Sequence, residues 1–540
     1  MSRKKRIGAM TIFGLLCMLM LYLLGTFRIS MNQGERNADQ GVYYSLPKDT
    51  STEDPLEYIR EDYTVEESFH TNLPIVILSI DTELTQYKSF KNENEMEWVD
   101  ESAEPYSKGT IRIIASKEKP SYLTDEPVYI SHINIKKRGH TSFTFDKSQY
   151  LLKMLDADGE ENDSEILGMG KGDSWILNGS MADKSMLRNY LPYRIASDIS
   201  GGAMAPDSRY CEVLIEKNGV YEYGGVYLLM ETVSRGKNRT NIDRFKSKKS
   251  YTSYIVRRDR FTNFDVMLDT YGRLNELSPE WIGVKYPSSE KLTEEAKRFI
   301  EQDFSKIEKV IYSEKESIFK IYDRYINIDS FVDYFLINEF FGNYDAGAHS
   351  TYMYKNSGGH LFIGPVWDFD QAMNNYYQNE MDPYTMAFQT KPFFEQLTKD
   401  KRFIDLLRKR YSELRQGALS EEHVVEVMNE AVDYLTAARE REWYRWEADY
   451  KDASFANPNN YYLQDYVKDN VIVSRFNDEY EQELYTIRTY LHKHGNAIPT
   501  ELTKLYDMAK YNTSIKNENQ LLLLVIMLLF LVPSILINRR

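Results

Sequence analysis

The sequence predicts an α+β fold with two lobes, a sheet-rich N-lobe and a mainly helical C-lobe that carries one β-hairpin, flanked by two transmembrane helices. Three observations predict this class. An apolar run lies near each end of the chain, short β-like runs fill the first half of the region between them, and amphipathic helical patterns fill the second half. Of the 540 residues, 42% are hydrophobic and 42 are tyrosines, which excludes a disordered or collagen-like chain.

The charge balance of the chain limits its partners. The formal net charge is −15, whereas binding to nucleic acid or anionic lipid needs clustered Lys and Arg that neutralise phosphates. We therefore expect no nucleic-acid partner, and metal ions or cationic partners fit better. The two cysteines, Cys17 and Cys211, cannot form a disulfide framework within the globular region.

The first apolar run covers residues 7–27 and follows a basic start at residues 3–6. Its length matches the ~20 residues that a bilayer requires. A signal peptide also has a basic start and an apolar centre, but this run is long for one and no small-x-small cleavage site follows it. The pattern therefore favours an uncleaved transmembrane anchor.

The second apolar run covers residues 521–537, contains no charge and is followed by Arg539 and Arg540. Basic residues thus flank the outer end of each run, and the positive-inside rule places such residues in the cytoplasm. We expect a cell-membrane protein with both termini in the cytoplasm and the large domain on the other side.

These patterns divide the chain into five segments. Hydrophobic periodicity predicts the two lobes, and the polar composition predicts the stalk. Residues 1–28 form the basic start and first transmembrane helix, 29–70 a flexible polar stalk, 71–235 the N-lobe with its connector, 236–515 the C-lobe, and 519–538 the second transmembrane helix.

Within the N-lobe, β-branched and apolar runs bounded by turn residues predict strands at LPIVILSID, GTIRIIA, VYISHINIKKRG, QYLLKML and CEVLIEKNGVYEYGGVYLLMETV. One helix is expected among them, with Asp183 or Ser185 as its N-cap. From Glu294 onward the periodicity is helical. Two β-like runs, TYMYKN and HLFIGPVWDFD, interrupt it and predict a hairpin.

The segment NEFFGNYDAGAHSTYMYKNSGGHLFIGPVWDFD places Asp345 in a loop after a helix, and Asp368 and Asp370 at the end of the hairpin. Phosphoryl transfer needs one group that orients the acceptor hydroxyl and another that holds magnesium against the phosphates. Paired carboxylates also serve as the acid and nucleophile of a glycosidase, or as a structural calcium site. Asp370 either orients the turn or binds the metal directly.

A second pattern lies upstream, in IKKRGHTSFTFDKSQYLLKM, where Gly139 stands in a turn with Arg138, Lys147 and Lys153 nearby. Backbone N–H groups in such a turn can hold a phosphate, although an ordinary hairpin turn has the same pattern. Lys153 lies among apolar residues of a strand, so it either extends to solvent or reaches a buried anionic ligand.

Together these segments resemble the CotH kinase family of bacterial proteins, a branch of the protein-kinase-like fold. The resemblance covers residues 73 to about 500 and is carried by RGHTS with KSQYLLKM after it, LNGSMADKSMLRNYL, GGVYLLMETV, GNYD and GPVWDFD, in this order.

The resemblance implies that Asp345 is the catalytic aspartate, that Asp368 binds magnesium, and that Lys153 pairs with the phosphates of ATP. It assigns the remaining nucleotide contacts to Arg138, Gly139, Thr141 and Ser142 in the phosphate-facing turn, to Trp367 beside the nucleotide and to Glu231 in the hinge. Ser350 departs from the expected pattern, because kinase-like catalytic loops commonly have a metal-binding Asn at this position. This substitution puts a second metal in doubt.

The resulting hypothesis is a phosphotransferase that uses ATP with Mg²⁺ or Mn²⁺ and modifies Ser or Thr in a Ser/Thr-rich surface or spore-coat protein. The alternative is a pseudokinase that binds wall, carbohydrate or protein partners without turnover. The Ser350 substitution and the predicted external location, where ATP is scarce, both favour the alternative. A glycoside hydrolase that uses Asp345 and Asp368 is a third interpretation.

Overall fold

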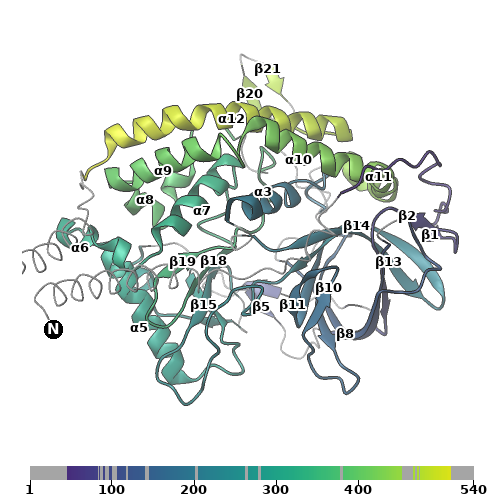
Figure 1. Cartoon of the computed structure of the whole chain (residues 1–540), viewed down its shortest axis with the longest axis horizontal. Coiled ribbons are helices and arrows are strands. Elements are labelled where there is room, and N and C mark those ends of the chain that lie inside the picture. Colours follow the sequence, from purple (N-terminus) through teal and green to yellow (C-terminus); the bar gives the residue numbers. More distant parts are fainter. Residues whose placement is uncertain are drawn as a thin grey trace, which may run out of the picture.

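The structure is a computed structural model with two larger β-sheets, four two-stranded pairs and a layer of helices (Figure 1). It describes residues 46–82, 84, 89–91, 97–99, 106–116, 120–139, 145–179, 181–200, 205–261, 265–277, 281–376, 381–452, 466–468, 471–473 and 475–511.

The larger sheet has eight strands in the order β1-β14-β12-β9-β8-β6-β3-β13. Strand β13 also pairs with β14, so the sheet closes on itself, and all pairs are antiparallel except β13 with β3. Its strands are β1 (Thr64–Val65), β3 (Ile75–Ile80), β6 (Ser107–Ile114), β8 (Tyr129–Arg138), β9 (Gln149–Leu155), β12 (Ser174–Asn178), β13 (Ser208–Lys217) and β14 (Val220–Glu231). Two-residue or slightly longer strands form separate pairs: β2 (His70–Thr71) with β7 (Ser121–Tyr122), β4 (Ser89–Lys91) with β5 (Glu97–Val99), β10 (Ser164–Ile166) with β11 (Met169–Gly172), and β20 (Tyr466–Lys468) with β21 (Val471–Val473).

Alternation along β8 and β9 gives this sheet one apolar and one basic face. Ile133 and Ile135 of β8 and Leu152 of β9 are fully buried in one core cluster. Because successive residues of a strand point to opposite faces, Lys136 and Lys153 lie on the other face. By the same alternation Lys136 and Arg138 of KKRG are directed away from the apolar interior of the closed sheet, whereas Lys137 is not.

The second sheet has five strands in the order β16-β17-β15-β18-β19. They are β15 (Tyr254–Asp259), β16 (Val266–Met267), β17 (Trp281–Tyr286), β18 (Thr351–Lys355) and β19 (Leu361–Ile363). The expected hairpin exists as β18 and β19, but it extends a larger sheet. The predicted C-lobe with a single hairpin is corrected accordingly, because YIVRRD and WIGVKY also form strands and pair with each other.

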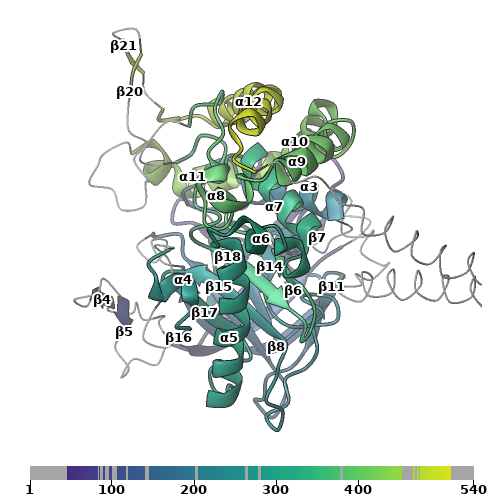
Figure 2. The same ribbon diagram turned by 90° about the vertical axis from the view of Figure 1, so that its left-hand side faces the viewer.

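The described helices are α3 (Tyr190–Ser200), α4 (Tyr271–Leu274), α5 (Glu294–Ile311), α6 (Glu316–Phe319), α7 (Ile328–Phe340), α8 (Phe394–Leu397), α9 (Lys401–Leu414), α10 (Glu421–Tyr434), α11 (Thr436–Lys451) and α12 (Tyr480–Met508). Most of them form a layer above the two sheets, whereas α5 lies lower, beside the second sheet (Figures 1 and 2). Helix α12 runs across the top of the layer in Figure 1, above α9 and α10. Helix α7 is buried along most of its length and ends at the loop that carries Asp345.

The predicted helix at Asp183 or Ser185 begins later, at Tyr190. Asp183 instead folds the preceding segment into a turn, because its Oδ1 accepts from the Ser185 amide at 3.1 Å and its Oδ2 accepts from the Arg188 amide at 2.8 Å. The described part of the predicted stalk, residues 46–70, also has structure, and Phe69 is fully buried there. Packed structure therefore begins before residue 71.

No helix in the described part of the chain is long and apolar enough to cross a membrane. The structure therefore does not support the predicted fold class with two transmembrane helices, nor the cell-membrane location and topology that were inferred from them. Helix α12 has 29 residues, but Glu483, Arg488 and Lys504 interrupt it with charge. The predicted spans, in segments 1–28 and 519–538, lie outside the described residues.

Helix α11 attaches the helical layer to the larger sheet through two buried ion pairs. Arg441 contacts both carboxylate oxygens of Glu212 at 2.8 Å. The next residue, Glu442, accepts from Lys147 Nζ at 2.5 Å and from the Val226 amide at 2.7 Å. Neither Lys147 nor Glu442 is more than 1% exposed. The loop before β9 and strand β14 are thus fixed to α11 by charge as well as by apolar contact.

A third buried pair, His494 of α12 with Glu339 of α7, predicts a pH-dependent stability. Nε2 of His494 lies 3.0 Å from Glu339 Oε1, and Nδ1 lies 3.0 Å from the Pro383 carbonyl. Burial alone would lower the pKa of His494, but the hydrogen bond and charge of Glu339 outweigh it and raise the pKa. A raised histidine pKa stabilises the fold below its unfolded pKa of ~6.5, and this stabilisation is lost as the pH rises through the folded pKa.

We expect the free energy of unfolding of the wild type to fall between pH 6 and pH 9, and His494→Gln to remove part of that fall. Urea titrations at pH 6 and pH 9 measure the free energy of unfolding of each protein. His492→Gln is the matched control, since His492 is 58% exposed on the same helix. Equal pH dependence in the wild type and His494→Gln would show that the pair does not act in this way.

Candidate functional site

The loop after α7 holds Asp345 in a fixed backbone. Gly342 has a φ of +61°, and a Cβ there would lie 2.2 Å from Tyr490 Oη, so only glycine fits the turn. The side-chain amide of Asn343 donates to the Trp367 carbonyl at 3.2 Å. The carbonyl of Asp345 accepts from the His349 amide at 2.9 Å. The loop of the first aspartate is therefore linked to the segment that carries the second.

Asp368 follows β19 and has a φ of +61°, an uncommon conformation for an aspartate. Its amide donates to Tyr193 Oη at 3.2 Å, which ties it to α3. Its Oδ2 accepts from Ser350 Oγ at 2.9 Å, and Ser350 also has a positive φ of +47°. The structure thus brings Asp345, Ser350 and Asp368 of the sequence prediction together in one site.

The two carboxylates influence each other's titration. Partial burial, and then repulsion from Asp368, raise the pKa of Asp345 to about 6, against the attraction of Arg260 and Lys391. Asp368 reaches solvent, but neighbouring atoms crowd it and this desolvation raises its pKa, while Ser350 and Arg138 lower it. A site that resists holding two negative charges favours binding of a cation.

Arg138 is the residue of the larger sheet whose charge acts on Asp368. It ends β8, its Nη1 donates to Gln149 Oε1 at 2.8 Å, and its charge lowers the pKa of Asp368. The next residue, Gly139, has a φ of +113°, as the predicted turn requires. Thr141 and Ser142 of the same turn lie outside the described residues.

A group of cations extends from Arg138 along the basic face. Crowding, and then repulsion from Arg257, Lys136 and Arg138, lowers the pKa of Lys285 to about 8. Burial, and then repulsion from Lys153, lowers the pKa of Lys136. Cations that repel one another are stabilised by a polyanion placed among them, so this group forms a favourable environment for phosphates.

Lys153 belongs to this basic face and Lys147 does not. The ammonium of Lys153 pairs with Glu161, its side chain is 31% exposed, and Nζ lies 5.4 Å from the centre of the Tyr106 ring. Lys147, the neighbouring lysine of the same motif, is buried against Glu442. Of the two, only Lys153 is accessible to a ligand.

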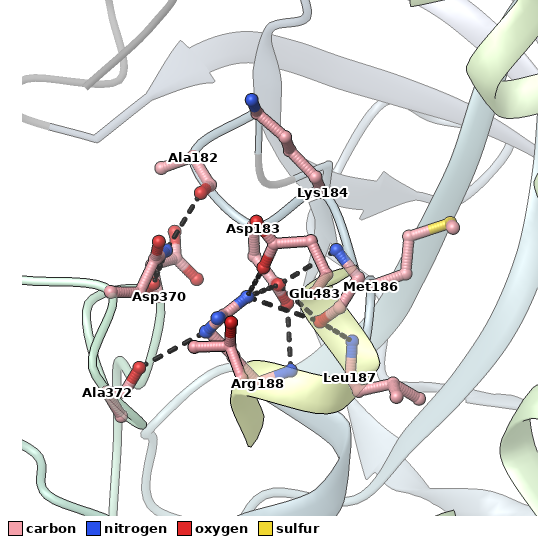
Figure 3. Close-up of polar contacts among 12 residues, drawn as sticks. Ala182, Asp183, Lys184, Met186, Leu187, Arg188, Asp370, Ala372 and Glu483 are labelled. Carbon is pink, nitrogen blue, oxygen red and sulfur yellow. Dashed lines mark hydrogen bonds and ion pairs between the residues drawn. The ribbon is translucent and has the colours of Figure 1, made fainter. Parts of the chain in front are cut away.

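Asp370 is half-buried and held by hydrogen bonds. Its Oδ1 accepts from the side-chain amide of Asn189, and its carbonyl accepts from Asn375 at 2.7 Å. Figure 3 shows it beside Arg188, whose Nη1 lies 2.8 Å from Asp183 and 2.6 Å from Glu483. Nε of Arg188 donates to the Ala372 carbonyl at 3.1 Å, which fixes the loop after Asp370 to α12 and to the start of α3. These contacts favour the interpretation that Asp370 orients the turn.

Trp367 and Glu231 lie deeper than the aspartates. Trp367 is 6% exposed and packs edge-on against Tyr352 at 5.6 Å between ring centres. Glu231 ends β14 at the crossing to the second sheet, and its Oε2 accepts from the Asp207 amide at 2.9 Å. Their assignment to the nucleotide stays a prediction.

Several charged residues of the site were not identified in the sequence, namely Lys136, Arg257, Asp259, Arg260, Lys285 and Lys391. Asp259 is the last residue of β15 and Arg260 follows it, and Arg260 Nη2 lies 3.5 Å from His349 Nε2 in the loop after Asp345. The run VRRDR, at the end of a β-branched segment, was the available signal for Arg257, Asp259 and Arg260. Lys391 belongs to a loop far along the chain, and no local pattern marks it.

The residues present fit a magnesium ion that is bound together with a nucleotide. Among the described residues, no three His, Cys, Asp or Glu side chains form a ready-made metal site. Magnesium in phosphoryl-transfer sites is commonly bound through one or two carboxylates plus substrate phosphates and water. Asp368 supplies such a carboxylate, with Asp345 beside it, and the basic face supplies charge for the phosphates.

Comparison with protein families gives one match, which covers most of the described structure. The profile of the family described as CotH kinase protein matches residues 135–495. No curated protein matches the chain. The matched range begins in β8, just before Arg138, and ends in α12, so it contains Asp345 and Asp368 with the cations that surround them.

Proposed function

The chain belongs to the CotH kinase family, and from this premise we propose that its site transfers the γ-phosphate of ATP to Ser or Thr hydroxyls of a protein with the help of Mg²⁺ or Mn²⁺. One observation carries the proposal: Asp345 and Asp368 lie close enough for the charge of Asp368 to raise the pKa of Asp345, and the charge of Arg138, at the end of the basic face, lowers the pKa of Asp368. Two carboxylates beside a row of cations provide for a metal and for phosphates in the same place.

Each residue has a distinct role in this proposal. Asp345 orients the acceptor hydroxyl and receives its proton, Asp368 holds the metal, and Arg138 with Lys153 binds phosphate oxygens. The metal supplies charge neutralisation on the phosphates when it is bound. The rate then comes from positioning and electrostatics, because the basic face and the two loops are already held by hydrogen bonds. A Ser- or Thr-rich protein, such as a spore-coat protein, is the acceptor that we propose.

Ser350 favours a second candidate function, that of a pseudokinase that binds a protein partner without turnover. Its hydroxyl donates to Asp368 Oδ2, and a hydroxyl is a weaker magnesium ligand than a carboxylate or an amide oxygen. Label transfer distinguishes the two functions. We expect the purified full chain to transfer label from γ-labelled ATP to Ser/Thr-rich polypeptides with Mg²⁺ or Mn²⁺, and not with EDTA. No transfer by the wild type with either metal would favour the pseudokinase.

A further inference from the structure

A pocket of about 240 Å³ opens beside the loop of Asp345, on the side of α7 and α12. Its lining includes Tyr344, Tyr376, Met381, Phe388 and Tyr490. Neither the nucleotide contacts nor the metal ligands of the proposed reaction use it. The pocket therefore has no role in the site as described so far.

Four aromatic side chains and Met381 line the pocket, together with polar and charged residues that include Glu339, Asp382 and Lys391. The rings of Tyr344 and Tyr376 lie 4.4 Å apart between centres. Met381 packs closely against Gly342, since a Cβ on Gly342 would lie 2.9 Å from Met381 Cε. The position of Phe388 is fixed through its amide, which donates to Glu339 Oε2 at 2.7 Å.

The pocket and the catalytic loop share two residues. Tyr344 lines the pocket, is 39% exposed and directly precedes Asp345 in the chain. Lys391 also lines the pocket, donates to the Tyr344 carbonyl, and lies with Nζ 4.1 Å from the centre of the Tyr344 ring. Its charge also acts on Asp345. Tyr344 and Lys391 thus connect the pocket to Asp345, and one or two residues of an extended polypeptide span only ~3.3–3.6 Å each.

We infer that this pocket binds a large apolar side chain, aromatic or aliphatic, that lies one or two residues from the Ser or Thr that accepts the phosphate. The inference rests on the proposed phosphotransfer and names the class of acceptor. The aromatic and methionine walls favour an apolar occupant, because they gain contact area without requiring a polar partner. Lys391 positions the peptide at the boundary between the pocket and Asp345.

A set of serine peptides tests the inference with the full-length protein, Mg²⁺ and ATP. Peptides that carry Phe, Leu or Met at one of the four positions next to Ser are compared with peptides that carry Ala or Asp there. We expect kcat/KM to be at least ~10-fold higher for the apolar set at one position, the size of effect that an apolar pocket provides.

Two variants locate the preference. Thr385→Trp fills the pocket from its exposed rim, while Thr390→Trp places the same ring on an exposed residue outside the lining. We expect Thr385→Trp to remove the apolar preference without changing the KM for ATP, and Thr390→Trp to retain the preference. Met381→Ala provides a second test, because widening the pocket should shift the preference towards larger side chains.

The outcomes separate this inference from the proposed function. Transfer to all peptides with equal kcat/KM, or an apolar preference that Thr385→Trp does not remove and Met381→Ala does not shift, would overturn the pocket inference and leave phosphotransfer intact. If the wild type transferred phosphate to no peptide or protein, the proposed function would be overturned and the inference with it.

Discussion

Asp345→Asn is expected to lower kcat for phosphate transfer by ~10²–10⁴-fold, the usual contribution of a positioned general base. An amide keeps the size of the carboxylate but cannot receive the proton of the acceptor hydroxyl. The KM for ATP should change little, because Asp368 and the basic face remain. Initial rates with γ-labelled ATP, measured across ATP concentrations, give both constants.

The same substitution should not weaken the fold, and this separates a catalytic effect from a structural one. The pKa of Asp345 is raised to about 6 by burial and by Asp368, so its negative charge is unfavourable in the folded state at neutral pH. We expect the melting temperature of Asp345→Asn at pH 7.5 to equal or exceed that of the wild type. Asp405→Asn, at a 52% exposed carboxylate of α9, is the neutral control. A loss in kcat of less than threefold would exclude Asp345 as the base.

Glu442→Ala is expected to lower the free energy of unfolding by about 3–5 kcal/mol, the cost of leaving one member of a buried ion pair without its partner. Three groups lose an acceptor: Lys147 Nζ at 2.5 Å, Tyr450 Oη at 2.7 Å and the Val226 amide at 2.7 Å. The chain is built closely around this carboxylate, since a Cβ on Gly225 would lie 2.3 Å from Glu442 Oε2. Denaturant titration at pH 7 measures the loss.

A double substitution provides the control for the ion pair. The double variant Lys147→Met with Glu442→Gln removes both charges and roughly keeps both side-chain volumes. Its free energy of unfolding should therefore be higher than that of Lys147→Met or Glu442→Gln alone, because neither charge is left buried without its partner. Glu447→Ala, at a 56% exposed residue of the same helix, should change the stability by less than ~1 kcal/mol. Additive losses in the double variant would show that the two charges do not act as a pair.

Much of the fold could be predicted from local pattern. The alternation of β-branched residues placed β3, β6, β8, β9 and the β13–β14 hairpin, and helical periodicity placed α5 from Glu294. The second sheet was underestimated because YIVRRD and WIGVKY are short, and their pairing with the β18–β19 hairpin depends on contacts between distant segments. The membrane prediction rested on two apolar runs alone, and the described residues contain no helix that could cross a membrane.

The site could be predicted only where its residues share a motif. GNYD and WDFD identified Asp345 and Asp368 because each follows a recognisable element, and the two loops meet through Asn343 and the Trp367 carbonyl. The choice between the two lysines of KSQYLLKM was beyond local pattern, since the partner of Lys147 lies 295 residues away in α11. Lys391 and Lys285 reach the site through tertiary structure, and for this reason no local motif identifies them.

A crystal structure of the protein with Mg²⁺ and the non-hydrolysable ATP analogue AMP-PNP tests the central claim most directly. The account predicts a metal bound between the Asp368 carboxylate and the phosphates, a γ-phosphate that faces Asp345, and phosphate oxygens in contact with Arg138 and Lys153. A nucleotide bound away from both aspartates, or a metal held by other residues, would contradict it.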